Sequence, residues 1–168
     1  MNKYIYIVLL FTSSLLPAQV VTIIEAQAEV TFNFIDDDVD GVFEGFSFTG
    51  QVDLNDLSNS VISGSVETKT IDTNNWLRSR HLRAKKFFNA KDFPQLTFNS
   101  TSISGSKIVF RVYGTLKIKG VQKEVVWIFT NDGKTLRGTT TINTTDFNIE
   151  IHDDRQRNKT VVTITLPY

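Results

Sequence analysis

The 168-residue sequence contains no cysteine, which excludes disulfides and a lipid-modified cysteine. Its only two histidines, His81 and His152, lie far apart and show no H-x-x-x-H or H-E-x-x-H spacing, so no metal site is expected. Neither a G-x-S-x-G nucleophile motif nor a glycine-rich phosphate or dinucleotide motif occurs. These absences predict a protein that is not an enzyme and that needs no cofactor.

An excess of one charge is also missing, because 18 basic residues balance 18 acidic ones. Without a net positive field, nucleic acid is not an expected partner. The longest apolar run stands at the start, where Lys3 precedes a stretch that ends at Pro17-Ala18. With about 13 apolar residues, against about 20 for a membrane helix, it predicts a signal peptide over residues 1–18. Cleavage near Ala18 would leave a single periplasmic or secreted domain, residues 19–168.

Apolar and polar residues alternate along most of this domain, which is the period of a half-buried β-strand. The alternation predicts eight strands, around residues 24–34, 46–54, 62–66, 96–98, 108–118, 125–129, 136–142 and 162–166. Short turn sequences such as Lys119-Gly120 and Asn131-Asp132-Gly133 separate them, so neighbouring strands should pair antiparallel. Such strands form either two stacked sheets or a closed barrel, and their length and regularity favour an all-β, eight-stranded antiparallel barrel.

One window breaks the alternation, between residues 73 and 89. Apolar residues recur there at helical spacing after Thr73 or Asn74, either of which can cap a helix. The pattern predicts one short helix around residues 74–88. Its core-facing side would carry Leu77, His81, Ala84 and Phe88.

Five motifs then occur in an order typical of one known family. They are Gly41-Val42-Phe43, His81-Leu82-Arg83, Phe93-Pro94-Gln95-Leu96-Thr97-Phe98, Gly114-Thr115-Leu116-Lys117-Ile118-Lys119-Gly120 and Thr141-Ile142-Asn143-Thr144-Thr145-Asp146-Phe147. Within residues 23–166 this order resembles the YceI-like family of polyisoprenoid-binding proteins. The resemblance implies a lipocalin-like barrel, exported to the periplasm, that holds a long isoprenoid or similar amphiphilic chain. The chain departs from the family in the acidic segment 36–45 and the charged loop 153–159.

The inward face of the expected barrel mixes small residues with phenylalanines. Glycines such as Gly64, Gly114 and Gly138 can leave room for a slender ligand, or they can bend strands while the rings fill the centre. The resemblance favours the open interior. The predicted apolar lining is Phe32, Phe34, Phe46, Phe48, Val66, Phe98, Phe110, Val112 and Leu116.

A run of basic residues lies within the expected helix. Most of these charges suit a solvated helix face, but they also suit an anionic head group or transient contact with an anionic membrane. Arg80, His81 and Arg83 are the candidates for head-group contacts, although a lone histidine on the inner side is more often structural. Near the start of the domain, Asp36 to Asp40 lack the distal glutamate of a calcium loop and predict a solvated turn.

Three functions follow from these patterns. The leading one is a carrier or scavenger whose partner is a long isoprenoid or acyl lipid. The second is a barrel with a filled core that binds a protein partner through its charged loops under stress. The third is a lipid-modifying enzyme that uses His81 as acid or base, for which the rest of a catalytic constellation is missing. Pairing of two barrels into a homodimer is left open.

Overall fold

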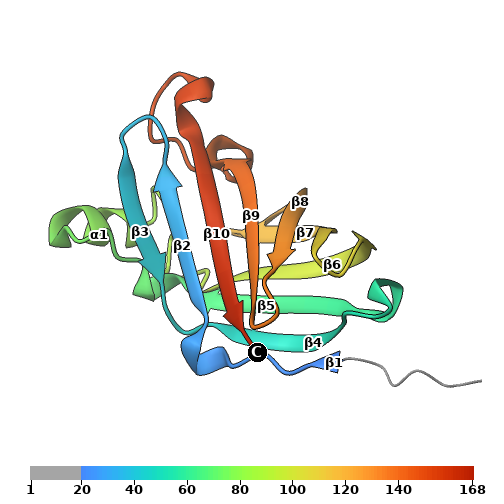
Figure 1. Ribbon diagram of the computed structural model, residues 1–168. Coiled ribbons are helices and arrows are strands. Elements are labelled where there is room, and N and C mark those ends of the chain that lie inside the picture. The colour runs from blue at the N-terminus through green and yellow to red at the C-terminus, as the bar shows by residue number, and fades with distance from the viewer. Residues whose placement is uncertain (1–19) are drawn as a thin grey trace, which may run out of the picture.

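The computed structural model describes residues 20–168, which fold into one strongly curled antiparallel sheet (Figure 1). Its strands are β1 (Val20–Val21), β2 (Glu29–Phe34), β3 (Val39–Phe43), β4 (Ser47–Asp53), β5 (Val61–Glu67), β6 (Gln95–Gly105), β7 (Val109–Ile118), β8 (Val121–Asn131), β9 (Thr135–Asn143) and β10 (Lys159–Pro167). The helices are α1 (Trp76–Arg83) and the 3-10 turns η1 (Glu25–Gln27), η2 (Leu57–Asn59), η3 (Thr68–Thr70), η4 (Thr144–Phe147) and η5 (Arg155–Asn158). The predicted signal peptide lies outside the described residues.

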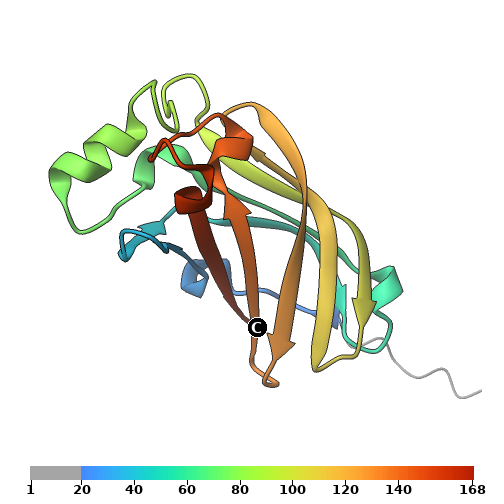
Figure 2. The same cartoon turned by 90° about the horizontal axis from the view of Figure 1, so that it is seen from above.

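The all-β antiparallel class is confirmed, but the prediction of a closed, eight-stranded barrel is wrong. Ten strands pair in the order β1-β4-β5-β6-β7-β8-β9-β10-β2-β3, so the sheet is a half-barrel with β1 and β3 at its edges (Figure 2). β3 pairs with β2 on one side only. On its other side, the chain segment around Asp72 lies where a further strand would pair. Val42 N donates to Asp72 O at 2.8 Å, and Asp72 N donates to Val42 O at 3.1 Å. The segment that leads into α1 thus protects an edge that would otherwise be exposed.

The strand count differs at the start of the domain. The alternation from Ile24 to Ala28 is not a strand but the turn η1, in which Gln27 N donates to Ile24 O at 3.0 Å. Conversely, β1 and β3 add the two strands that the sequence pattern missed. A two-residue strand and a five-residue strand that follows an acidic run are both too short to show a clear period.

The helix is shorter than predicted and turns a different side to the core. It begins after Asn75, whose side chain accepts from Arg78 N at 3.0 Å, and it ends at Arg83. Ser79 fixes its rotation by accepting from Thr73 N and donating to Asp72 Oδ1, each at 2.9 Å. Leu82 therefore faces the core, whereas three of the four residues predicted to do so, Leu77, His81 and Ala84, are exposed. The fourth, Phe88, is buried beyond the end of the helix.

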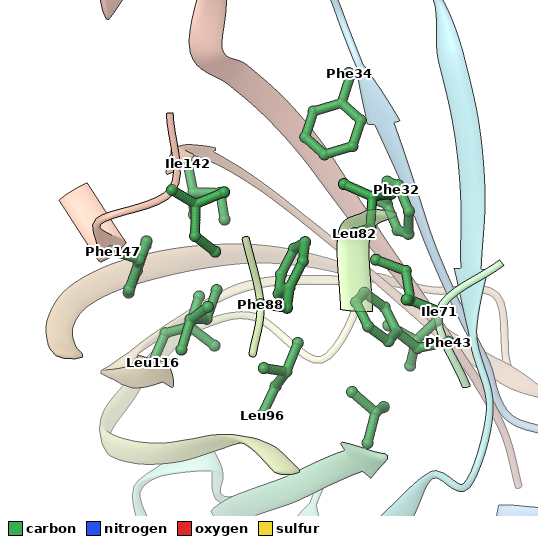
Figure 3. Close-up of a cluster of buried hydrophobic side chains, with 14 residues drawn as sticks. Phe32, Phe34, Phe43, Ile71, Leu82, Phe88, Leu96, Leu116, Ile142 and Phe147 are labelled. Carbon is green, nitrogen blue, oxygen red and sulfur yellow. The ribbon is translucent and has the colours of Figure 1, made fainter. Parts of the chain in front are cut away.

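Two groups of buried side chains fill the curl of the sheet. The first, which we name the helix-side cluster, contains Val30, Phe32, Phe34, Phe43, Val66, Ile71, Leu82, Phe88, Leu96, Leu116, Ile118, Ile142, Phe147 and Ile149. Figure 3 shows its labelled side chains converging from β2, β3, α1, β6, β7, β9 and η4. The second, the far cluster, contains Val21, Ile23, Val52, Leu54, Leu57, Ile62, Ile103, Phe110, Val112, Trp127, Phe129, Leu136 and Leu166. Among residues 20–168, no helix is long and apolar enough to span a membrane.

Candidate ligand cavity

A cavity of about 120 Å³ lies inside the curled sheet. Residues from nine strands, β2 to β10, line it, because side chains of each strand point alternately inward and outward. Its wall is apolar except for a few serine and threonine side chains, and none of the described residues that line it is titratable. The polar members are Ser63, Ser65, Thr97, Thr144 and Thr160. The interior is thus suited to an apolar group and offers no charge to balance an ion.

Seven of the nine residues predicted to form the lining face this cavity, namely Phe32, Phe34, Phe46, Phe48, Val66, Phe98 and Leu116. The other two, Phe110 and Val112, are buried in the far cluster and do not reach the cavity. Phe110 instead stacks on Phe129, with ring centroids 5.3 Å apart and an interplanar angle of 5°. The strand period assigns both residues to the inward face, but it does not say how far along the interior the cavity extends.

The inward glycines do not leave open space, which corrects the expectation that small residues widen the interior. Phenylalanine rings cover several of them. A Cβ atom at Gly138 would lie 2.5 Å from the ring of Phe129, and one at Gly41 would lie 2.1 Å from the ring of Phe32. Both pairs are direct cross-strand neighbours. The glycines therefore let aromatic rings lie flat on the adjacent strand, and these rings narrow the cavity.

Three polar atoms along the cavity wall lack hydrogen-bond partners in the described part of the chain: Thr144 Oγ1, Thr160 Oγ1 and Trp127 Nε1. Each belongs to a side chain that is at most 7% exposed. Thr144 and Thr160 lie where β9 ends and β10 begins, whereas Trp127 lies within β8 beside Phe98. A buried donor or acceptor without a partner costs about 1–3 kcal/mol. A ligand with a polar end could satisfy such atoms inside an otherwise apolar cavity.

The residues predicted to contact a head group do not line the cavity. Arg83 Nη1 donates to Lys69 O at 3.1 Å, so its guanidinium holds the chain before the helix. His81 is exposed, and the Arg80 guanidinium lies 5.7 Å from the centre of the Trp76 ring. All three therefore belong to the outer surface around α1.

The acidic turn between β2 and β3 is exposed, as predicted, but two of its carboxylates also contact side chains of the loop before β10. His152 Nε2 lies 2.7 Å from Asp37 Oδ2, and Arg157 Nε donates to Asp36 Oδ2 at 2.6 Å. The hydrogen bond to the Asp36 carboxylate raises the pKa of Arg157 above its usual value. These contacts join the acidic segment after β2 to the charged loop before β10. They became visible only when the fold placed segments 115 residues or more apart side by side.

The same contacts bear on metal binding. Asp36, Asp37 and His152 offer ligand atoms within 4.8 Å of one another. However, the Asp36 carboxylate already contacts the Arg157 guanidinium, and the Asp37 carboxylate already contacts the His152 ring. Both carboxylates thus already have a side-chain partner within the protein.

A β-sheet curled around an apolar cavity is the architecture of barrel proteins that can hold ligands in their interior. The family model of the YceI-like domain matches residues 22–167. The chain belongs to the YceI-like family, as its motifs predicted.

Three similar proteins illustrate this relationship. Protein YceI of Salmonella arizonae is 35% identical over 85 residues, which make up 51% of this chain and only 44% of that protein. The structure of Burkholderia cenocepacia BcnA aligns with a TM-score of 0.76 and 21% identity over 86% of this chain and 98% of BcnA. A polyisoprenoid binding domain from Saccharophagus degradans, implicated in plant cell wall breakdown, aligns with a TM-score of 0.59 and 11% identity over 89% and 97% of the two chains. These structural likenesses show a shared fold.

Proposed function

We propose that this protein is an exported carrier or scavenger that holds a long apolar chain, of polyisoprenoid or fatty-acyl type, inside its half-barrel. The observation that carries the proposal is the apolar cavity bordered by the helix-side cluster. The likeness to a polyisoprenoid binding domain supports the same class of ligand. The absence of titratable side chains among the described lining residues supports a binding role in place of an enzymatic one.

Burial alone can supply the affinity for such a ligand. Each methylene removed from water contributes about 0.8 kcal/mol, before the cost of ordering the chain. A cavity of about 120 Å³ accepts only a ring-sized segment, since an apolar cavity of roughly 150 Å³ holds one benzene. A longer chain therefore enters as rings along the wall rotate away, and the half-buried Phe46, Phe48 and Phe98 are the rings that we expect to move.

The unpartnered hydroxyls set the orientation of the ligand. Thr144 and Thr160 lie at the end of the cavity where η4 follows β9. We place the polar end of an amphiphile there, with its tail directed toward Trp127 and Phe129 in the far cluster. Hydrogen bonds from neutral hydroxyls would tolerate several polar groups, so we expect selection by chain length to exceed selection by head group.

A filled core that serves only as a scaffold for partner binding is the second candidate. The rings that cover Gly41, Gly114 and Gly138 favour it, because they occupy much of the interior. The two candidates differ in whether the interior opens to admit a chain.

Native mass spectrometry of protein purified without detergent, followed by organic extraction, tests the proposal. We expect a discrete added mass that extracts as an isoprenoid or acyl lipid, and affinity that rises along a series of longer chains. Val66→Trp fills the cavity and should abolish uptake, whereas Val126→Trp places the same side chain on the exposed outer face and should not. A bare protein that also refuses added lipids would support the filled core instead. The N-terminal residue of the exported protein tests cleavage near Ala18.

A further inference from the structure

The first turn of α1 exposes two large apolar side chains next to each other. Trp76 is 70% exposed and Leu77 is 52% exposed. Trp76 is the most exposed large apolar side chain of residues 20–168. Figures 1 and 2 show that α1 stands out from the sheet beyond β3, so its outer side is open to a large partner. Exposed apolar side chains that adjoin one another often mark an interaction site, whereas single scattered ones do not.

The chain around this apolar pair carries positive charge alone. Residues 73–91 contain six basic and no acidic residues, which leaves twelve basic and eighteen acidic residues elsewhere. None of these six forms a salt bridge in the described part of the chain. Arg78 and Arg83 hydrogen-bond the neighbouring segment, but Arg80, Lys85 and Lys86 are exposed. Arg80, Lys85 and Lys86 are therefore exposed cations without an ion-pair partner among the described residues.

We propose that residues 76–87 form a docking surface for an anionic lipid bilayer. Tryptophan is enriched at membrane interfaces, where its ring is buried and its N–H remains hydrated, and Leu77 can enter the same layer. Arg80, Lys85 and Lys86 then reach the lipid phosphates, while their stems cover apolar surface. The Arg80 guanidinium already lies over the Trp76 ring, so the cation and the inserting ring occupy one side of the helix. A bilayer combines an apolar layer with negative charge, and it satisfies both features at once.

This surface is joined to the cavity through its own segment. Leu82, on the opposite side of α1, is 6% exposed and packs in the helix-side cluster. Phe88, one residue beyond the docking surface, lines the cavity. The inference deepens the proposed function, because it names an anionic bilayer as the source or destination of the lipid. Docking itself requires only the outer surface, so the two proposals can fail separately.

Co-sedimentation of the full chain with vesicles tests the docking surface. We expect binding to an equal mixture of phosphatidylcholine and phosphatidylglycerol, weak binding to phosphatidylcholine alone, and loss of binding at high salt. Each exposed cation near an anionic surface is worth roughly fivefold in affinity. The variant Arg80→Glu/Lys85→Glu should therefore lose at least about tenfold, and Trp76→Ser/Leu77→Ser should lose binding even at low salt. The matched control is Lys107→Glu/Ile108→Ser, which removes an exposed cation and an exposed apolar side chain from the β6–β7 turn, away from α1.

The two tryptophans separate docking from cavity binding. Trp76 is on the docking surface and Trp127 is 7% exposed on the cavity wall. Vesicles should shift the emission of Trp76 to shorter wavelength, and Trp76→Phe leaves Trp127 as the reporter of a ligand such as a brominated fatty acid. Equal binding to neutral vesicles, or unchanged binding by the folded charge-reversal variant, would overturn the docking surface. Quenching of Trp127 in that case would show that the lipid-binding proposal still stands.

Discussion

The two buried clusters of the half-barrel arise from the same alternating pattern but differ in how closely they pack. Twelve of the fourteen helix-side residues line the cavity, against four of the thirteen far-cluster residues. In the far cluster, Val52, Val112 and Leu136 have no exposed surface, and two rings are stacked. The far cluster is therefore a solid core that holds the sheet, and the helix-side cluster is the wall of a cavity. Inward direction alone does not tell a core residue from a lining residue.

Truncating a ring in each cluster gives the largest expected effect on stability. Phe110→Ala should lower the free energy of unfolding by about 3–5 kcal/mol, because the ring is fully packed. Phe34→Ala should cost only about 2 kcal/mol, because one side of that ring already borders empty space. Urea unfolding of the two variants measures the difference. Equal costs would show that the two clusters are packed alike.

Adding a methyl group beneath a ring should be the next largest effect. Gly138→Ala places a Cβ against the ring of Phe129 and should destabilise the protein by about 1–3 kcal/mol. In the double variant with Phe129→Leu, the smaller side chain should leave room for the methyl group. A double-mutant cycle by thermal unfolding measures the coupling. Additive effects would mean that the ring does not rest on the glycine.

Replacing a cavity hydroxyl by a methyl group should act on stability and binding in opposite directions. Thr160→Val removes a buried hydroxyl without a partner and should stabilise the ligand-free protein by up to about 1 kcal/mol. The same change should weaken binding of an amphiphile, since the polar end loses its hydrogen bond. The control is Thr140→Val on the next strand, where the hydroxyl donates to Val126 O at 2.9 Å. That variant should lose about 1 kcal/mol with ligand binding unchanged, as unfolding and ligand titration of both variants will show.

The charged contacts between the β2–β3 turn and the loop before β10, which we call the rim, should contribute far less to stability than either cluster. Arg157→Ala breaks the contact with Asp36 and should cost less than about 1 kcal/mol, because both side chains are substantially exposed. The cost should shrink further at high salt. Chemical unfolding at low and high salt measures it. A loss comparable to that of Phe110→Ala would mean that the rim holds the half-barrel together.

The smallest expected effect is a shift in the pKa of Asp72, which holds the start of α1 through Ser79. The Ser79 hydroxyl, followed by backbone N–H groups, holds the pKa of Asp72 below its usual value of 3.8. A carboxylate with a lowered pKa contributes stability that is present above pH 3.8 and is lost as the pH falls through the lowered pKa. Ser79→Ala should raise the pKa of Asp72 toward its usual value. An NMR titration of the Asp72 carboxyl measures the change, and an unmoved pKa would remove Ser79 from this role.

The sequence predicts the existence of the strands from β4 to β10, because each has an alternating run or a clear turn beside it, but its bounds for β6 and β8 are too short. It fails where local pattern and tertiary context diverge. The alternation at Ile24 continues into η1, and the side of α1 that faces the core is decided by Ser79 and Asp72 through hydrogen bonds that no helical period reveals. The site follows the same rule. Inward residues were found, but the rings over Gly41, Gly114 and Gly138 and the contact between Asp37 and His152 depend on which strands and loops meet.

The rings that rest on glycines also constrain how this sequence can change over generations. A substitution at Gly41 or Gly138 becomes acceptable only after the facing ring, Phe32 or Phe129, has become smaller. The aromatic residue can change first, because a smaller side chain there does not clash with the glycine. Related chains should therefore show these positions varying together, with the aromatic residue lost first and the glycine second.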